Sequence, residues 1–199
     1  MASEYARIAE SDVDILQLDS PDLLMDQHKM FADRSVEEFK EIVRTHVEAL
    51  NRALEGVSSE RTRLHVCWGN YEGPHHHDVA LEAILPLLYE ADIGGLTVEL
   101  ASPRHQHEIG IFEEHESPAD WTLYPGVIDV KINILEHPEV IAERIERAAN
   151  VVGAPSRIVA APDCGFGTLA GWERVDDEIA WAKLETLTEG AALASERLF

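Results

Sequence analysis

The sequence predicts an α/β protein in which five strand and helix units form a parallel sheet. Three observations lead to this fold class. Short runs rich in β-branched residues alternate with longer segments of helical periodicity. Strands that alternate with helices imply right-handed crossovers, and therefore parallel strands. An unusually long connection, residues 101–126, follows the third strand, and such connections often carry functional residues.

The predicted strands are five short apolar runs, and the chain is expected to form one domain over residues 1–199. The runs cover residues 15–18, 64–68, 96–100, 127–132 and 157–161. Five units cannot close an eight-stranded barrel by themselves. The strand count therefore leaves two architectures open, a part of a (βα)8 barrel or an open doubly wound sheet.

Four helices are predicted between and after these strands, over residues 35–54, 78–91, 138–153 and 176–195. Ser35 and Glu38 have the spacing of a capping box at the start of the first helix. Pro86 is expected to kink or shorten the second helix. Pro138 suits the first position of the third helix, and Gly153 can close its end.

Composition narrows the classes of function. The formal net charge of -22 in 199 residues repels phosphate backbones and anionic lipid surfaces, so we expect neither nucleic acid nor a membrane as partner. The polar, acidic N-terminus and the lack of a long apolar run predict a cytoplasmic protein. In that reducing compartment, Cys67 and Cys164 favour catalysis or metal binding over a disulfide.

His65 and Cys67 form the most informative pair. Residues two apart on a strand point to the same face, so both side chains can reach one ion. Zinc binds imidazole nitrogen and thiolate sulfur, and it needs further ligands from elsewhere. Glu99 and Cys164 stand at or after the ends of other predicted strands, and strand ends meet at one rim of a parallel barrel. The alternative is that the cysteines are small buried hydrophobic residues.

Other polar residues permit more than one interpretation. Three consecutive histidines before Asp78 are a rival metal cluster, but we expect a solvated loop in which Asp78 caps the next helix. His105 lies in the long connection and is a candidate substrate contact. Asp19 either caps the following helix or binds substrate.

Several ordered motifs resemble a known family. They are HVCWGNYEGP at residues 65–74, VEL at 98–100, PGVIDVK at 125–131 and PDCGFGT at 162–168. At these residues the chain resembles the cobalamin-independent methionine synthases, in the form of a catalytic barrel, and the related epoxyalkane:coenzyme M transferases. The resemblance implies that the five strands are the fourth to eighth of a TIM (βα)8 barrel, with the three N-terminal units absent.

The resemblance also implies a zinc cofactor and its ligands. The family binds zinc with a His and a Cys two residues apart, a Glu one strand later and a Cys in an Asp-Cys-Gly motif. These ligands correspond to His65, Cys67, Glu99 and Cys164.

The resemblance makes two further residues candidates for the site. Asp19 corresponds to the family's aspartate that holds the amino group of the thiol substrate. Lys131, a candidate catalytic residue, stands where methionine synthases carry a histidine, and Ser20 replaces the glutamate after that aspartate. These two departures put homocysteine and folate as substrates in question without affecting the zinc ligands.

The function implied by the resemblance is zinc-dependent alkylation of a thiol. The first expectation is methyl transfer from a methyltetrahydrofolate-type donor to homocysteine, giving methionine. The alternatives are alkylation of coenzyme M by an epoxide, a structural or storage zinc site, and a truncated half-barrel that is inactive without a partner chain. The expected partners are the small-molecule thiol, the alkyl donor and either an N-terminal half-barrel chain or further copies of this chain.

Overall fold

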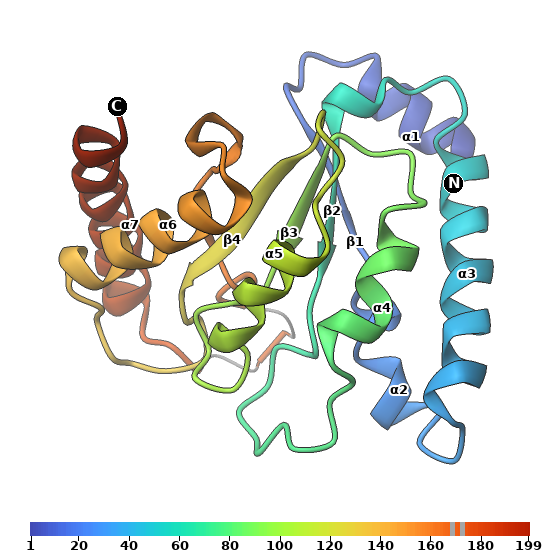
Figure 1. The fold of residues 1–199 in the computed structure, drawn as a ribbon, viewed down its shortest axis with the longest axis horizontal. Helices are drawn as coiled ribbons and strands as arrows, with labels where there is room; N and C mark the ends of the chain where they lie inside the picture. Colours follow the sequence, from blue (N-terminus) through green and yellow to red (C-terminus); the bar gives the residue numbers. More distant parts are fainter. Residues whose placement is uncertain (168–169, 172–173) are drawn as a thin grey trace.

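The structure, a computed structural model, describes residues 1–167, 170–171 and 174–199. Its five strands form one parallel sheet, in which spatial order follows chain order (Figure 1). The strands are β1 (Leu16–Asp19), β2 (Thr62–Val66), β3 (Gly95–Val98), β4 (Thr122–Ile128) and β5 (Ala161–Pro162). A doubly wound sheet reverses its strand order at a switch point, whereas a barrel does not. The order therefore favours a part of a barrel.

The α-helices pack on the outer side of this curved sheet (Figure 1). They are α1 (Ala2–Ala9), α2 (Asp26–Lys29), α3 (Val36–Ala53), α4 (Leu81–Leu88), α5 (Ile111–Glu114), α6 (Pro138–Val152) and α7 (Asp177–Leu198). Four short 3-10 turns cover Pro21–Leu23, Ser59–Arg61, Gln106–Gly110 and Pro155–Arg157. Within the described residues, no helix is both long enough and apolar enough to span a membrane.

The predicted helix ends are confirmed where a side chain or glycine fixes them. The Ser35 hydroxyl accepts a hydrogen bond from the Glu38 backbone N–H, and the Glu38 carboxylate accepts one from the Ser35 N–H. Pro138 is the first residue of α6, and Gly153 ends that helix with φ of 70°. Helix α4 contains Pro86 and ends two residues later, shorter than its predicted span.

The predicted bounds of the last two strands are wrong. Strand β4 begins at Thr122, before the run that was predicted, and ends at Ile128 because Asp129 starts a turn in which its carboxylate accepts from the Lys131 N–H. Strand β5 contains only Ala161–Pro162, since Arg157 ends a 3-10 turn, Ile158 forms an isolated bridge and residues 159–160 have no regular structure. These shifts move residues 129–132 out of the sheet and into the loops of the rim.

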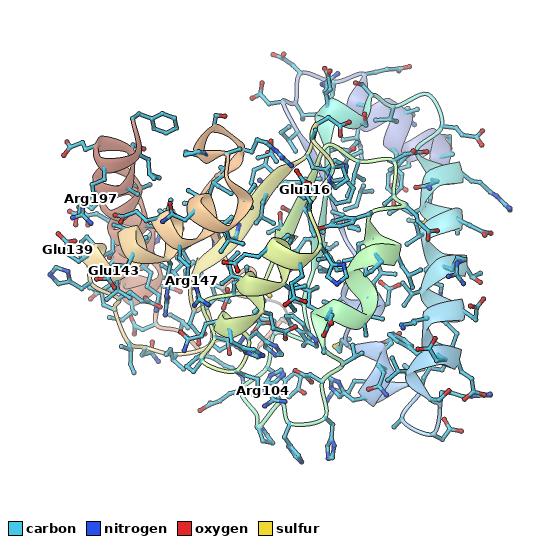
Figure 2. The ribbon with its side chains drawn as sticks, viewed as in Figure 1. Arg104, Glu116, Glu139, Glu143, Arg147 and Arg197 are labelled. Carbon is cyan, nitrogen blue, oxygen red and sulfur yellow. The ribbon has the colours of Figure 1, made fainter. Side chains whose placement is uncertain are left out.

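The core lies between the sheet and the helices, and it fixes the residue that follows Cys67. The Trp68 ring is fully buried and its indole N–H donates to the Val79 carbonyl at 2.7 Å. On the other flank, α7 packs along α6, and Arg197 lies beside Glu139 at 2.7 Å (Figure 2). The Trp68 contact joins the end of β2 to the segment before α4, and the ion pair joins α7 to α6.

Candidate active site

The site lies at the rim where the parallel strands end. In the ladder between β1 and β2, Asp19 is the Cα partner of His65. Cys67 follows directly after β2, and Cys164 follows β5 after one intervening residue. Neighbouring strand ends in a parallel sheet point the same way, which gathers residues far apart in the chain.

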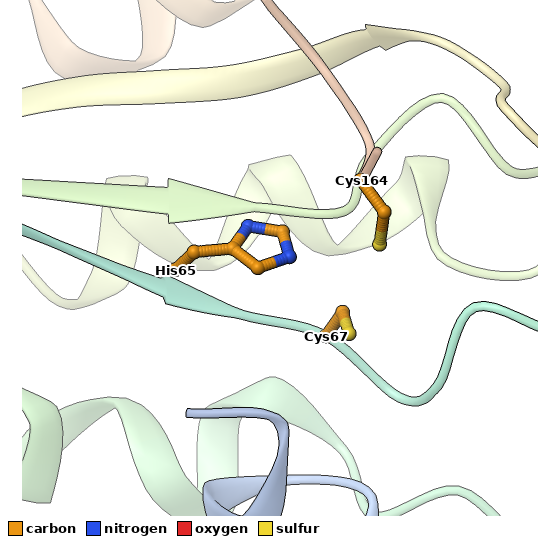
Figure 3. Close-up of side chains that lie close together, drawn as sticks. All are labelled: His65, Cys67 and Cys164. Atoms are coloured by element: carbon orange, nitrogen blue, oxygen red, sulfur yellow. The ribbon is translucent and has the colours of Figure 1, made fainter. Parts of the chain in front are cut away.

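Three of the four predicted metal ligands meet at this rim. The ligand atoms of His65, Cys67 and Cys164 lie within 4.8 Å of one another (Figure 3). All three residues are buried, with 7%, 4% and 8% of their surface exposed. The two sulfurs, 97 positions apart in the sequence, therefore share one centre with an imidazole ring.

A buried carboxylate holds the loop of Cys164 in place. Asp163 accepts hydrogen bonds from three successive backbone N–H groups that follow β3, at 2.8 to 3.0 Å. Gly126 of β4 makes room for it, because a Cβ at this position would lie 2.0 Å from Asp163 Oδ1. The Asn70 amide donates to the Gly165 carbonyl at 2.7 Å and ties the loop after β2 to the loop of Cys164.

The neighbouring groups favour the thiolate form of Cys67. A hydrogen bond from Cys164 lowers the pKa of Cys67 to about 5, against the effect of burial and with further help from His65. The same hydrogen bond, together with burial, raises the pKa of Cys164. Burial opposes the charged form of His65, but the hydrogen bond with Cys67 and the charges of Cys67, Asp19 and Glu99 together outweigh burial and raise the pKa of His65. The hydrogen bonds from its neighbours thus stabilise the thiolate form of Cys67 over the thiol.

Glu99, the fourth predicted ligand, is not part of this close group. Its carboxylate is fully buried, and Oε1 accepts a hydrogen bond from the Lys131 ammonium. Oε2 is also buried and has no hydrogen-bond partner among the described residues. Burial disfavours the charge of Lys131, but Glu99 and Asp163 outweigh burial and raise the pKa of Lys131. Lys131 is thus a weaker acid than a free lysine and acts as the counter-ion of Glu99.

The donor set fits zinc. One imidazole and two thiols are ligands that zinc favours, and their mutual distances allow a shared ion. The unpartnered oxygen of Glu99 adds a carboxylate that lies close enough to raise the pKa of His65 and Cys164 through its charge. Three of the predicted ligands could therefore hold an ion together, whereas Glu99 is paired with Lys131 and its role as a ligand stays a prediction.

A cavity of about 430 Å³ opens beside the two sulfurs. His65, Cys67 and Cys164 line it, and so do Asp19 and Arg63 of the two first strands. Asp19 does not cap the following 3-10 turn, whose first residue has no side-chain cap. The structure thus places Asp19 where it can contact a small molecule that reaches the sulfurs.

The other predicted substrate contact, His105, lies outside this cavity. Its ring is 1% exposed and stacks on Trp68 with centroids 3.7 Å apart. Its two nitrogens bind the carboxylates of Asp78 and Glu108, both at 2.9 Å. The prediction of substrate contact is therefore not kept for His105, because the ring is covered and both nitrogens are engaged.

The predicted solvated histidine loop is also partly wrong. His75 is buried, and its Nδ1 lies 2.7 Å from Asp78 Oδ2, so Asp78 binds histidines instead of capping α4. His28 lies 3.1 Å from the other oxygen of Asp78. His75, Asp78 and His105 have the spacing of possible metal ligands, but the short contacts among them form a hydrogen-bonded network. Only the next two histidines of the loop are exposed.

Comparison with known proteins agrees with this geometry. The family model of the cobalamin-independent synthase catalytic domain matches residues 1–184. The chain belongs to this family. Membership in the cobalamin-independent synthase family confirms the resemblance that the motifs indicate. Of the motif at residues 162–168, Thr168 lies outside the described residues.

Two curated relatives show how the family varies. The chain is 30% identical over 177 residues to 2-hydroxypropyl-CoM lyase of Xanthobacter autotrophicus, an alignment that covers 76% of this chain and 45% of the lyase. It is 27% identical over 127 residues to methionine synthase of Thermoplasma volcanium, covering 61% of this chain and 37% of that protein. The chain thus spans less than half the length of these two relatives.

A solved structure shows the same fold. A B12-independent methionine synthase from Shewanella sp. W3-18-1, in complex with selenomethionine, matches with a TM-score of 0.72 and 19% identity. The match covers 99% of this chain and 53% of that chain. The predicted partial (βα)8 barrel is therefore confirmed, and the open doubly wound sheet is excluded.

Sequence reasoning missed residues that support the site from neighbouring positions. Arg63 shares the inner face of β2 with His65 and Cys67, and the two-residue periodicity of a strand could have included it. Asp163 belongs to the motif at residues 162–168, but its role in anchoring the loop was missed. A carboxylate beside a candidate ligand is a signal of such anchoring. The contacts of His75 with Asp78 and His105 join separate loops, so no local pattern reveals them.

Proposed function

We propose that this chain carries the thiol-activating centre of a zinc-dependent thiol alkyltransferase. The observation that carries the proposal is the meeting of His65, Cys67 and Cys164 at the rim, beside a cavity that reaches the sulfurs. Family membership supports the same class of chemistry. Glu99 is proposed as the fourth ligand, since one of its buried oxygens has no partner among the described residues.

The chemistry that zinc supplies is deprotonation of a bound thiol, whose pKa near 8.5 otherwise leaves it mostly protonated at neutral pH. The chain's own residues prepare the site for that guest. The lowered pKa of Cys67 favours metal binding near neutral pH, because less free energy is needed to remove its proton. Asp163 fixes the loop of Cys164, so the second sulfur does not have to be ordered on binding.

Lys131 is proposed to act through Glu99. Without metal, the ammonium group neutralises the buried carboxylate. Glu99 would help to hold a bound ion through the oxygen that has no partner, and Lys131 would offset the charge of that carboxylate. A direct catalytic contact between Lys131 and the substrate stays a prediction.

Methyl transfer from a methyltetrahydrofolate-type donor to homocysteine is the proposed reaction. The sulfur of homocysteine forms a bond to the methyl carbon, and the nitrogen of the donor leaves with the electron pair of the broken bond. Asp19, which lines the cavity, is the proposed contact of the amino group. Alkylation of coenzyme M is the second candidate. It is favoured by the 30% identity to a CoM lyase and by Ser20 and Lys131, which differ from the residues that methionine synthases carry at these positions.

The test is to change the two cysteines separately and to measure zinc content and thiol alkylation. We expect Cys67→Ser and Cys164→Ser each to lose most of the bound zinc and the activity. Ser117→Ala removes a buried hydroxyl that accepts a hydrogen bond from Arg157 and does not line the cavity, and this control should keep both zinc and activity. Full zinc occupancy in the Cys67→Ser/Cys164→Ser double variant would refute the ligand assignment.

A further inference from the structure

One wall of the cavity carries two opposite charges that an amide side chain holds apart. Arg63 Nε donates to Gln17 Oε1 at 2.8 Å, and Gln17 Nε2 donates to Asp19 Oδ1 at 2.8 Å. All three residues line the cavity. Among the described residues Arg63 and Asp19 form no ion pair with each other, because Gln17 occupies the space between the two charges.

Both charged groups keep free hydrogen-bonding capacity. Neither Nη atom of Arg63 has a hydrogen-bond partner in the described part of the chain, and the same holds for Asp19 Oδ2. The Arg63 guanidinium lies over the Tyr124 ring, 4.7 Å from its centroid, which limits the orientations of its plane. The wall therefore offers a fork of N–H donors beside a carboxylate acceptor.

The strand register places this wall within reach of the sulfurs. Gln17 is the Cα partner of Arg63, and Asp19 is the partner of His65. Residues two apart on one strand are separated by about 6 to 7 Å, so Arg63 is two such steps from Cys67 and its long side chain can shorten that gap. The charged wall and both sulfurs line the same cavity, so a small thiol bound at the sulfurs can bring its charged groups to this wall.

We propose that Arg63 determines specificity by binding the acidic group of the thiol, while Asp19 binds its ammonium group. The site then selects an α-amino acid thiol, and the inference rests on the proposed function. A guanidinium matches the two oxygens of a carboxylate. An acidic thiol without an amino group would place its negative charge near Asp19 and give that carboxylate no cation. A zwitterionic thiol pairs its acidic group with Arg63 and its ammonium group with Asp19.

The test measures thiol binding to the zinc-loaded chain by calorimetry, with four thiols that form a matched set. Homocysteine carries both charged groups, 4-mercaptobutyrate lacks the amine, 3-aminopropanethiol lacks the acid and propanethiol lacks both. We expect Arg63→Gln to weaken homocysteine and 4-mercaptobutyrate by about 10- to 100-fold, the usual effect of losing a charge-assisted hydrogen bond. The affinity for 3-aminopropanethiol should stay unchanged, which also shows that the variant is folded.

Two further measurements complete the design. Asp19→Asn should weaken homocysteine and 3-aminopropanethiol but not 4-mercaptobutyrate, and Arg34→Gln, an exposed arginine of the outer surface, should change none of the four. Two results would overturn this inference but leave the proposed function standing. One is an equal loss of affinity for all four thiols in Arg63→Gln. The other is tighter binding of coenzyme M than of homocysteine by the unchanged chain. If no thiol binds, propanethiol included, the proposed function fails with it.

Discussion

The buried pair of Glu99 and Lys131 shows how single residues set the charge of the rim. Glu99 is fully buried and Lys131 is 8% exposed, so neither charge is screened well by water. An unpaired charge in such a place is costly, whereas the pair is tolerated. The sequence indicated Lys131 as a departure from the methionine synthases, but the link to Glu99 could not be predicted because it crosses between two strand ends.

Removing Lys131 should therefore cost more than an ordinary surface substitution. We expect Lys131→Met to lower the free energy of unfolding of the metal-free chain by about 3 to 5 kcal/mol, the usual effect of leaving one buried charge alone. Glu99→Gln in the same chain should recover most of that loss. Urea unfolding in the presence of a chelator measures both, and an unchanged stability of the single variant would show that the pair contributes nothing.

The histidine network gives a prediction for pH dependence. Burial opposes the charge of His105, but hydrogen bonds with Asp78 and Glu108 raise its pKa, and the hydrogen bond with Asp78 raises that of His75. Burial would raise the pKa of Asp78, yet the two histidines lower it to about 2. The histidine contribution to stability is therefore fully present below pH 6.5 and is lost as the pH rises through the raised values.

The variant His105→Gln isolates this contribution. We expect its loss of unfolding free energy, relative to the unchanged chain, to be largest near pH 6 and to shrink toward pH 9. The contribution of Asp78 to stability depends on pH in the opposite direction. It is fully present above pH 3.8 and is lost as the pH falls toward 2. His76→Gln, at an exposed neighbour, is the matched control. A loss that grows with rising pH would contradict this account.

At the scale of elements, the sequence pattern correctly predicts the helix ends that adjacent residues determine. The cap at Ser35, the start at Pro138 and the end at Gly153 are confirmed, since each depends on a few adjacent residues. The bounds of β4 and β5 were wrong because they depend on pairing between strands far apart in sequence. Short terminal strands near a rim also resemble the loops that follow them.

The contact between α6 and α7 depends on a glycine. A Cβ at Gly190 would lie 2.5 Å from Ile141 Cγ2 and 2.9 Å from the Pro138 carbonyl oxygen. Gly190→Ala gains about 1 kcal/mol of helix propensity but overpacks the interface, which commonly costs about 1 to 3 kcal/mol. We expect a net loss of stability in thermal unfolding. A higher melting temperature would show that the helices separate easily.

At the scale of the whole molecule, the five units leave a curved sheet with two edges. The edge strands β1 and β5 have no second strand partner among the described residues. The chain spans 53% of the solved methionine synthase, whose fold it shares over that part. Unpaired sheet edges in general favour association with another chain.

Association should depend on salt. The formal charge of -22 opposes contact between copies at low ionic strength, and screening removes that barrier. We expect light scattering to give the mass of one chain, 22.2 kDa, at low salt and a larger mass at high salt and high protein concentration. A monomer under all conditions that also turns over substrate would exclude the need for a partner.

Zinc X-ray absorption with and without homocysteine tests the central claim most directly. The account predicts a resting shell with two sulfurs and one imidazole nitrogen, completed by an oxygen, and a third sulfur in place of that oxygen when the thiol is present. A shell that contains no sulfur, or one that stays the same at saturating thiol, would contradict the assignment of this rim as a thiol-activating centre.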